Sequence, residues 1–348
     1  MIGPGMIRVS AAMPIPSVLG HFGIPLEPVL SDLGIRSDIF NDFENVIPYA
    51  TLCRLASRCA ALTKRDDFGL LVGQKGGFSS LGRVGFAAQH APTVGAAVDS
   101  VGEYFQLHDR GATSALRVNG PLAVVNYRVY HPEIEGADQV GDGAVAISFL
   151  ILQALCGPRW SATEVFFSRR KPANLKPYKE FFKSPLRFDC DSWGVSFPAA
   201  WLDHPVRQAE PVLRKLLVKD MQQLLAEAPD EFRDIVHRRV SETLSSGEFE
   251  TEAIAEFLGI SQRKLHRRLE AEGASFRAIL RDARYGAARQ LMGRTDLPVS
   301  EIAVMVGYSE TSAFVRAFKR WSGVTPGSWR HRTSSDRDSR AAEVGMTV

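Results

Sequence analysis

The chain contains one eight-residue segment twice. Residues 254–261 read Ile-Ala-Glu-Phe-Leu-Gly-Ile-Ser and residues 302–309 read Ile-Ala-Val-Met-Val-Gly-Tyr-Ser, so the pattern returns after 48 residues. Each copy holds apolar residues at helical spacing, then a glycine that can adopt a left-handed turn, then a serine (Ser261 or Ser309) suited to cap a second helix. Helix, turn and helix form a helix-turn-helix motif. The C-terminal third is therefore predicted to hold two such units.

The helix that follows the first turn has an apolar and a basic side. Leu265 and Leu269 lie four residues apart and are predicted to face a small core. This arrangement directs Arg263, His266 and Arg267 to the opposite, exposed side.

The helix after the second turn repeats this pattern with a shift. Phe314 and Phe318 take the core positions at a spacing of 49 residues from their counterparts, so one extra residue separates the Ser309 cap from the first core aromatic. The outward positions are Thr311, Ser312, Val315 and Arg316, with Lys319 and Arg320 one turn further on.

The outward side chains suit the recognition of double-stranded DNA. Arg and Lys can read guanine in the major groove, Ser and Thr can donate or accept at several base edges, and Val or Thr methyl groups can touch the thymine methyl. Basic side chains that do not reach a base neutralise phosphates, which makes affinity fall as the salt concentration rises.

Residues 275–292 join the two units and are predicted to form one continuous helix. Its apolar stripe consists of Phe276, Ile279, Leu280, Ala283, Ala287 and Leu291. A rod of about 17 residues at roughly 1.5 Å each is on the order of 25 Å long. One DNA turn is about 34 Å, so this rod and its flanking units can set both recognition helices in successive major grooves. The alternative is that the second unit, whose outward residues are less basic, is only structural.

The charge of the chain is divided unevenly along its length. Residues 261–332 hold 14 Lys and Arg against 6 Asp and Glu, a local charge of +8, whereas residues 1–260 hold 26 against 30, a local charge of −4. With 348 residues and 45% hydrophobic content, the chain is long enough for two domains. No apolar run reaches the roughly 18 to 20 residues of a membrane helix, and the N-terminus lacks a leader pattern. We therefore expect a cytoplasmic protein without a membrane partner.

The N-terminal two-thirds mix helical and strand patterns. Helical periodicity covers residues 14–74, 93–107, 137–156 and 210–228, and strand patterns cover residues 114–118, 122–130, 164–168 and 186–197. Asn119-Gly120 between two of these strands indicates a hairpin. The helix at 137–156 is apolar almost all round, which predicts burial against the sheet. A domain boundary is expected between residues 205 and 235.

The sequence shows no catalytic, cofactor or metal pattern. The four cysteines have neither zinc-ligand nor disulfide spacing, so they are predicted to be buried reduced thiols: Cys53, Cys59, Cys156 and Cys190. His108-Asp109 and His131 are interpreted as a turn or a satisfied surface pair, because no motif ties a nucleophile to them.

A basic segment follows the third predicted strand. It contains Arg169, Arg170 and Lys171, with Lys176, Lys179 and Lys183 further on. A solvated basic face is the favoured interpretation, and a contact surface for an anionic ligand or a phosphate backbone is the alternative.

The C-terminal residues resemble the AraC/XylS family of transcription regulators. The resemblance spans about 250–331 and includes the two repeated segments, residues 265–269 (Leu-His-Arg-Arg-Leu) and residues 313–321 (Ala-Phe-Val-Arg-Ala-Phe-Lys-Arg-Trp). It closes on residues 323–326 (Gly-Val-Thr-Pro) followed by Arg330, an ending specific to the DNA-binding domain of that family.

The N-terminal part is similar, more loosely, to the effector domain of one subclass, the ornithine-utilisation and virulence-type regulators. The matching segments are residues 157–160 (Gly-Pro-Arg-Trp), 164–167 (Glu-Val-Phe-Phe) and 177–182 (Pro-Tyr-Lys-Glu-Phe-Phe). This resemblance covers about 15–205 and implies a small α+β domain that binds a small molecule or mediates dimerisation. It shares no ligand motif that identifies the effector residues.

The two resemblances imply an α+β N-terminal effector domain, followed by an all-α C-terminal domain with two helix-turn-helix units joined by a linker helix. The expected divisions are a flexible N-terminus (1–14), an effector-binding domain (15–205), a helical linker (206–234), a DNA-binding domain (235–332) and a disordered tail (333–348).

They also imply a sequence-specific regulator that binds promoter DNA under the control of a small-molecule effector and recruits or repositions RNA polymerase, as an activator does. The resemblances do not decide whether the protein activates or represses transcription, or whether it is a monomer or a homodimer. Base-contacting positions of the family fall on Arg263, His266 and Arg267, and on Thr311, Ser312, Val315 and Arg316. The apolar Val315 departs from the long polar residue common there, which weakens hydrogen-bonded readout at that position.

Two other functions are compatible with a DNA-binding C-terminal domain. An enzyme carrying such a domain, as in alkyl-transfer repair, would need a reactive Cys motif or a metal cluster. An architectural nucleoid protein would not need the acidic N-terminal domain, and it would lack sequence preference at high salt.

Overall fold

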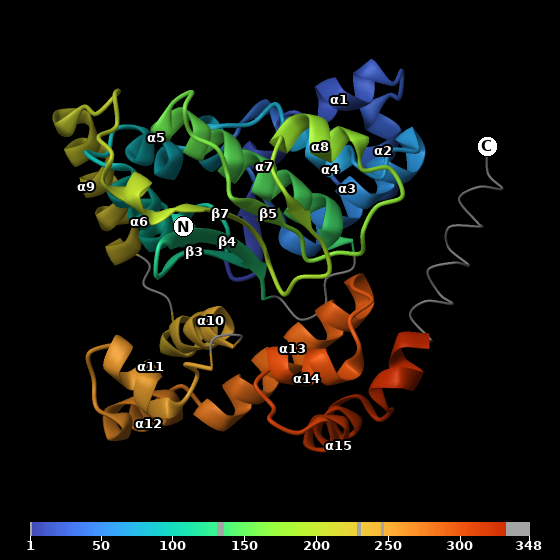
Figure 1. Ribbon diagram of the computed structural model, residues 1–348, viewed down its shortest axis with the longest axis vertical. Coiled ribbons are helices and arrows are strands. Elements are labelled where there is room, and N and C mark those ends of the chain that lie inside the picture. The colour runs from blue at the N-terminus through green and yellow to red at the C-terminus, as the bar shows by residue number, and fades with distance from the viewer. Residues whose placement is uncertain (1, 131–135, 228–230, 245–246, 332–348) are drawn as a thin grey trace. The chain divides into compact units, whose positions relative to one another are not determined.

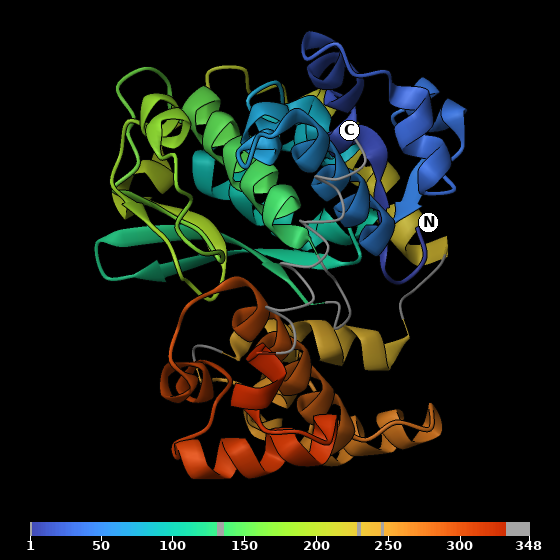
Figure 2. The same cartoon turned by 90° about the vertical axis from the view of Figure 1, so that its right-hand side faces the viewer.

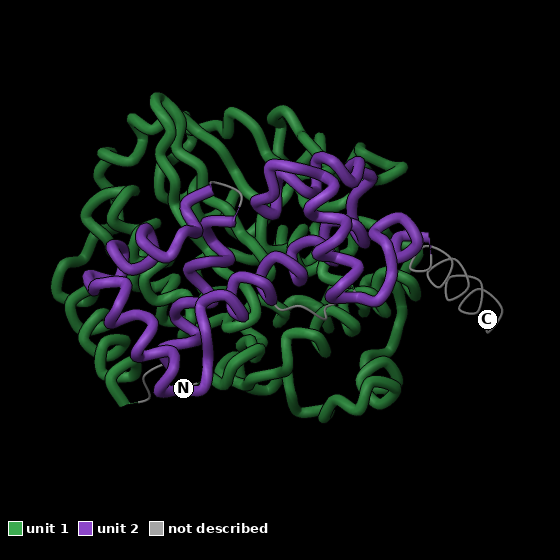
Figure 3. Tube along the Cα trace, turned by 90° about the horizontal axis from the view of Figure 1, so that it is seen from below, with its two compact units in different colours: residues 1–229 green, residues 230–348 purple. Residues whose placement is uncertain are grey.

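The structure is a computed structural model that describes residues 2–130, 136–227, 231–244 and 247–331. The chain divides into two compact units, Met1–Pro229 and Asp230–Val348 (Figure 3). Each has its own hydrophobic cores. His131 and the predicted tail at 333–348 lie outside the described residues.

The first unit is built on a five-stranded sheet with the order β3-β4-β7-β5-β6 (Figure 1). Its strands are β3 (Ala112–Asn119), β4 (Leu122–Val129), β5 (Glu164–Phe166), β6 (Leu186–Arg187) and β7 (Trp193–Pro198). The β5–β6 pair is parallel and the other pairs are antiparallel. Asn119 pairs with Leu122, and Gly120 turns the hairpin with a φ of +57°. The predicted strand at 186–197 is split because Asp189 adopts a left-handed φ of +57°.

Helix α7 (Ala137–Cys156) lies on one face of this sheet, against β4 and β7, and it has the predicted bounds (Figure 2). Helices α3 (Tyr49–Thr63) and α4 (Phe68–Gly73) pack against it. A Cβ atom at Gly69 would lie 1.9 Å from the carbonyl oxygen of Gln139, so α4 and α7 touch backbone to backbone.

The expectation that no apolar run could span a membrane is corrected by α7. By length and composition this helix is apolar enough to do so. It contains Asp138, Gln139 and Asp142, which interrupt the apolar run without lowering its mean hydropathy far enough. Because most of the helix is buried against the sheet and the neighbouring helices, it is a core helix.

The remaining elements of the first unit are short. The helices are α1 (Ile15–His21), α2 (Leu26–Asp32), α5 (Arg83–Gln89), α6 (Val94–Tyr104) and α8 (Lys176–Phe182). The 3-10 turns are η1 (Val9–Ala12), η2 (Ser37–Asn41), η3 (Phe78–Leu81), η4 (Phe105–Leu107) and η5 (Ala199–Asp203).

The N-terminus is not the flexible segment that was predicted. Strand β1 (Met6–Arg8) pairs antiparallel with β2 (Val46–Pro48), and Ile7 and Val9 are buried in the main core. Their burial removes apolar area from water, which favours an ordered segment. The same pairing makes residues 46–48 a strand within the segment 14–74 that was predicted to be helical, so α3 begins only at Tyr49.

Helix α9 (Pro211–Glu227) was predicted as part of a linker, but it packs on the first unit. Its buried Met221 joins a cluster with Val84 and Ala87 of α5 and with Tyr104. The two units divide after Pro229, inside the expected range of 205–235. The second unit begins with α10 (Phe232–Thr243), so its packing starts a few residues before position 235, where the DNA-binding domain was expected to begin.

The second unit is all α. After α10 it contains α11 (Thr251–Phe257), α12 (Gln262–Ala271), α13 (Phe276–Arg294), α14 (Val299–Met305) and α15 (Thr311–Ser322). Its two cores are joined by α13, the predicted linker helix. Phe276, Ile279 and Ala283 belong to the first core, whereas Leu291 and Met292 belong to the second. One continuous helix therefore carries both helix-turn-helix units.

Candidate nucleic-acid interface and effector cavity

The first helix-turn-helix is formed by α11, the turn and α12. Gly259 adopts a φ of +63°, which a glycine tolerates without a Cβ clash. Ser261 is the N-cap of α12, and its hydroxyl accepts a hydrogen bond from the Lys264 backbone N–H at 3.3 Å. The buried Leu265 and Leu269 fix the helix on its core.

The face of α12 opposite this core is exposed and basic. Arg263, His266 and Arg267 are all exposed there. Lys264 is exposed beside them and was missed, although helical spacing places it on the same half of the helix. Arg268 lies apart from this set, because its guanidinium stacks over the Phe232 ring at 3.9 Å.

The second helix-turn-helix differs from its prediction at the cap. The N-cap of α15 is Glu310 and not Ser309, and no side-chain cap hydrogen bond is made there. The extra residue of the second copy is thus accommodated in the turn rather than in the helix. The buried Phe314 and Phe318 hold α15 on the second core as predicted.

The outward residues of α15 are less uniform than predicted. Those that are exposed are Thr311, Ser312, Arg316, Lys319 and Arg320. Val315 is half-buried and packs against the second core, because its apolar side chain gains from contact with that cluster. Arg316, Lys319 and Arg320 also line a hollow beside Tyr308, so three cationic side chains lie around it.

The two helix-turn-helix units are tied together by Arg284 of α13. Its guanidinium lies 4.8 Å from the ring of Phe249, in the first core, and 4.7 Å from the ring of Tyr308, beside the second. Its Nη2 donates to the carbonyl oxygen of Gly307 at 2.9 Å. We call Arg284, Phe249, Gly307 and Tyr308 the inter-unit clasp. No spacing in the sequence pointed to it, since its members lie far apart along the chain.

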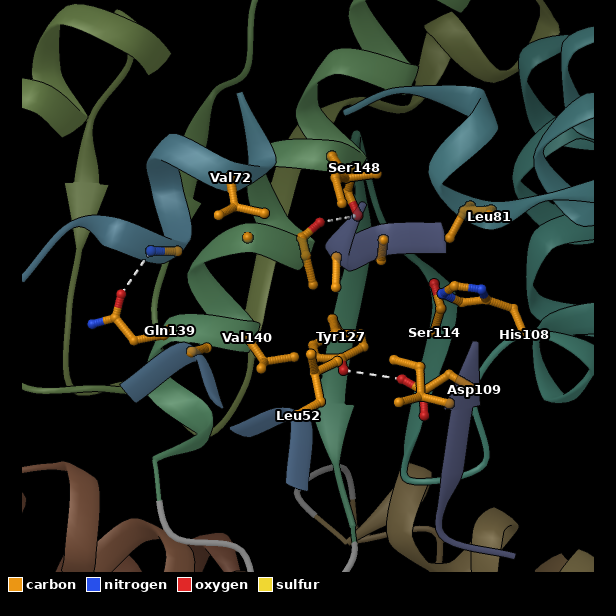
Figure 4. A pocket seen from close by; sticks show the side chains of 18 of the residues that line it. Leu52, Val72, Leu81, His108, Asp109, Ser114, Tyr127, Gln139, Val140 and Ser148 are labelled. Carbon is orange, nitrogen blue, oxygen red and sulfur yellow. Dashed lines mark hydrogen bonds between the residues drawn. The ribbon is translucent and has the colours of Figure 1, made fainter. Parts of the chain in front are cut away.

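The first unit contains a narrow cavity of about 80 Å³ among η1, α3, α4, α7 and the sheet (Figure 4). Its wall is mainly apolar and includes Ile7, Ile15, Leu52, Phe68, Val72 and Ile147. Figure 4 shows His108, Asp109 and Ser114 together on one side of the cavity and Gln139 on the opposite side.

The polar side of the cavity corrects the interpretation of His108 and Asp109 as a surface pair. Their exposed fractions are 3% and 2%. Oδ1 of Asp109 accepts the backbone N–H groups of Gly111 at 2.7 Å and Ala112 at 3.2 Å, and Oδ2 accepts the Tyr127 hydroxyl at 3.1 Å. The pair is buried because Leu107 and Ala112, its apolar neighbours in sequence, both enter the interior.

Burial shifts the pKa values of Asp109 and His108 in opposite directions. It raises the pKa of Asp109 to about 7, against the lowering effect of the hydrogen bonds from Gly111, Tyr127 and Ala112. It lowers the pKa of His108 to about 3, helped by the positive charge of Arg8. At neutral pH the histidine is therefore uncharged.

The two groups should have opposing effects on stability. Asp109 retains a proton from pH 3.8 to about 7 when folded, so it makes stability fall as pH rises through that window. His108 stays neutral from 6.5 down to about 3 when folded, so it makes stability rise with pH through that window. In His108→Gln only the effect of Asp109 remains, so we expect the free energy of unfolding to fall as the pH rises from about 4 to 7. In Asp109→Asn only the effect of His108 remains, so we expect the free energy of unfolding to rise from about pH 3 to 6.5. Each slope should be near 1.4 kcal/mol per pH unit at its steepest.

Urea unfolding at half-unit pH intervals checks this expectation. The difference in unfolding free energy between the wild-type protein and each variant isolates the titration of the substituted residue, because the other titrations cancel. Two variants that keep the wild-type pH profile would show that neither group titrates as its burial requires.

The predicted basic segment 169–183 is not one surface. Arg169 is only 7% exposed and pairs with Asp142 at 2.7 Å and Asp66 at 2.6 Å. Oδ2 of Asp142 also accepts the Tyr178 hydroxyl at 2.6 Å, and Oδ1 accepts the Trp193 indole N–H at 3.1 Å. Arg169 therefore belongs to a buried network within the first unit. Both interpretations of the segment were wrong for this residue.

Within the described residues there is no group of three or more His, Cys, Asp or Glu that could hold a metal ion. The four cysteines form no disulfide, and Cys53, Cys59 and Cys190 are buried as predicted, whereas Cys156 is only partly buried. Burial raises the pKa of Cys59 and Cys156 to about 12 and that of Cys190 to about 11. A thiol that stays protonated is a poor nucleophile.

Two family descriptions match the chain. "Arabinose-binding domain of AraC transcription regulator, N-term" covers residues 23–206, and "Helix-turn-helix domain" covers residues 254–332. The HTH-type transcriptional regulator VirS of Mycobacterium tuberculosis is 26% identical over 329 residues, which are 93% of this chain and 96% of VirS. The ornithine utilization regulator of Pseudomonas aeruginosa is 24% identical over 328 residues, with the same coverage of 93% and 96%. The crystal structure of the regulator CdpR from Pseudomonas aeruginosa matches with 21% identity and a TM-score of 0.43, covering 88% of this chain and 96% of that one.

An α+β domain with a mainly apolar cavity, followed by two helix-turn-helix units, defines a DNA-binding transcription regulator with an N-terminal ligand-binding domain. The chain belongs to the AraC family of transcription regulators. Its domains and its relatives are those of regulators and not of enzymes.

Proposed function

We propose that the protein is a sequence-specific regulator that contacts two successive major grooves of promoter DNA and is controlled by a small molecule bound in the cavity of the first unit. The observation that carries the DNA-binding part is the continuous helix α13, which contributes to the cores of both helix-turn-helix units. Its 19 residues at about 1.5 Å each form a rod of roughly 28 Å, close to one DNA turn of about 34 Å.

The proposed base contacts in the first groove are Arg263, His266 and Arg267, with Lys264 on a phosphate. In the second groove they are Thr311, Ser312 and Arg316, while Lys319 and Arg320 neutralise phosphates. These side chains are exposed, and they point away from the buried leucines and phenylalanines that fix each helix. Val315 is only half-buried, so its exposed part can still meet a thymine methyl.

The remaining partners follow from the family and from the first unit. We propose that DNA-bound protein recruits or repositions RNA polymerase in the cytoplasm. We also propose a homodimer, because Val212 and Leu216 of α9 are 68% and 61% exposed and leave an apolar strip for a second copy.

Arg267→Ala tests the recognition helix directly. We expect DNA affinity to fall by about 1–3 kcal/mol, which is roughly 5- to 150-fold, with sequence preference relaxed at one position. The measurement is a binding titration with a duplex that the wild-type protein has selected from a random pool. Arg36→Ala is the matched control, since it removes the same charge from an 83% exposed side chain of the first unit. If Arg267→Ala changed neither affinity nor sequence preference, the recognition-helix assignment would be wrong.

A further inference from the structure

We infer that the small molecule bound in the cavity is an uncharged, mainly apolar compound with a single polar end group, such as an aliphatic alcohol, and neither a sugar nor a carboxylate anion. This inference rests on the proposed role of the cavity and adds the chemical class of its ligand. It departs from the sugar after which the matching arabinose-binding domain family is named, because the residues that line the cavity differ from what a sugar needs.

The first observation is the shortage of hydrogen-bonding groups in the wall. Both ends of the Gln139 amide are occupied, since Oε1 accepts the Gly69 N–H at 2.7 Å and Nε2 donates to the Asp66 carbonyl at 2.8 Å. The Ser148 hydroxyl donates to the Ala144 carbonyl at 2.9 Å. A sugar brings a hydroxyl on nearly every carbon, and each one buried without a partner costs on the order of 1–3 kcal/mol. This wall could satisfy only a small fraction of them.

The second observation is the charge of the wall. The described residues that line the cavity include no Lys and no Arg. Their acid, Asp109, is already surrounded by three donors from Gly111, Ala112 and Tyr127. The high pKa of Asp109 has the same origin, since burial with no cation in the wall disfavours a negative charge. The positive charge of Arg8 that acts on His108 lies outside this wall and is paired with Glu44 at 2.5 Å. A bound carboxylate would therefore be buried without a counter-charge of its own.

The third observation is the position of the polar side chains in the wall. His108, Asp109 and Ser114 lie together on one side, and the walls between them and Gln139 are apolar (Figure 4). Burial keeps the His108 imidazole neutral, so it can take part in a hydrogen bond to an uncharged group without presenting a positive charge to an anion. The cavity therefore fits a ligand with one polar end directed at these three residues and an apolar body along Leu52, Val72 and Ile147.

The test compares matched ligands on the full chain by thermal shift. The probes are octan-1-ol and octanoate, decan-1-ol and decanoate, and L-arabinose, all at pH 7.5. We expect the alcohols to bind at least about tenfold more tightly than the acids of the same chain length, and arabinose to give no shift. Ala144→Leu, which fills the cavity from α7, should abolish the alcohol shift.

A second variant supplies what the wall lacks. Leu81 lies on the same side of the cavity as His108 (Figure 4), so Leu81→Lys places a cation beside the proposed polar end. We expect this variant to reverse the preference and bind octanoate more tightly than octan-1-ol. It also keeps the test decisive if Ala144→Leu does not fold.

The outcomes distinguish a failure of the proposed ligand class from a failure of the proposal that the cavity binds the effector. Acids that bind as tightly as alcohols, with both shifts lost in Ala144→Leu or altered in Leu81→Lys, would overturn the ligand class and leave the effector cavity in place. Shifts that neither variant alters would place binding elsewhere and overturn the cavity's role. The absence of any shift across both series would overturn that role as well.

Discussion

Replacing Gly307 with Ala is expected to destabilise the second unit by about 2–5 kcal/mol. The residue has a φ of +79°, a conformation that costs an L-residue about 1–2 kcal/mol. In addition, the new Cβ would lie 2.5 Å from the Phe249 ring and 3.2 Å from Nη2 of Arg284, so the inter-unit clasp must open. Such overpacking costs about 1–3 kcal/mol more. Urea unfolding of the full chain measures the loss.

Gly259→Ala is the matched control, because the same turn in the first helix-turn-helix has a φ of +63° and nothing within 4 Å of an added Cβ. Only the backbone contribution of about 1–2 kcal/mol should appear there. DNA binding should separate the two variants further, since an open clasp frees the recognition helices from their fixed spacing. Equal losses of stability in the two variants would mean that Phe249 and Arg284 do not hold the units together.

Asp142→Ala is expected to lower the free energy of unfolding of the first unit by about 3–5 kcal/mol. Removing this carboxylate breaks the buried ion pair of Arg169 and leaves the guanidinium with only the exposed Asp66, and breaking a buried pair carries a penalty of this size. The Tyr178 hydroxyl and the Trp193 indole lose their acceptor in the same substitution. The network joins α7, α8 and β7, so the loss should appear as a lower urea midpoint for the whole unit.

The control is Asp66→Ala, which removes the other carboxylate that pairs with Arg169. The Asp66 side chain is 61% exposed, so its pair is screened by water and should be worth less than about 1 kcal/mol. A loss for Asp142→Ala no larger than that for Asp66→Ala would show that the buried network is not what stabilises this part of the fold.

The helix-turn-helix pair could be predicted because its signals are local. The apolar spacing and the glycine of each turn act within a few residues, and they led to the two recognition helices and to the shared stripe of α13. The prediction of Ser309 as the N-cap of α15 was wrong. The repeat shows that the second copy has one extra residue before Phe314, but it does not show whether that residue belongs to the turn or to the helix. In the structure the turn absorbs it, and α15 begins after Glu310.

The cavity and the buried polar groups could not be predicted in the same way. Asp109 meets Tyr127 only through the pairing of β3 with the end of β4, and Arg169 meets Asp142 only where a loop passes over α7. These are long-range contacts between residues whose polar character favours exposure when the sequence is considered locally. The ordered N-terminus was missed for a related reason, since Ile7 and Val9 become core residues only when β1 pairs with β2.

The central claim is that one chain reads DNA with two recognition helices, and selection of binding sites from a random duplex pool tests it most directly. The account predicts two specified segments centred about 10 base pairs apart, one helical turn. It further predicts that Arg267→Ala relaxes one segment and Arg316→Ala relaxes the other. A single specified segment that Arg316→Ala leaves unchanged would contradict the claim and would make the second helix-turn-helix a structural element.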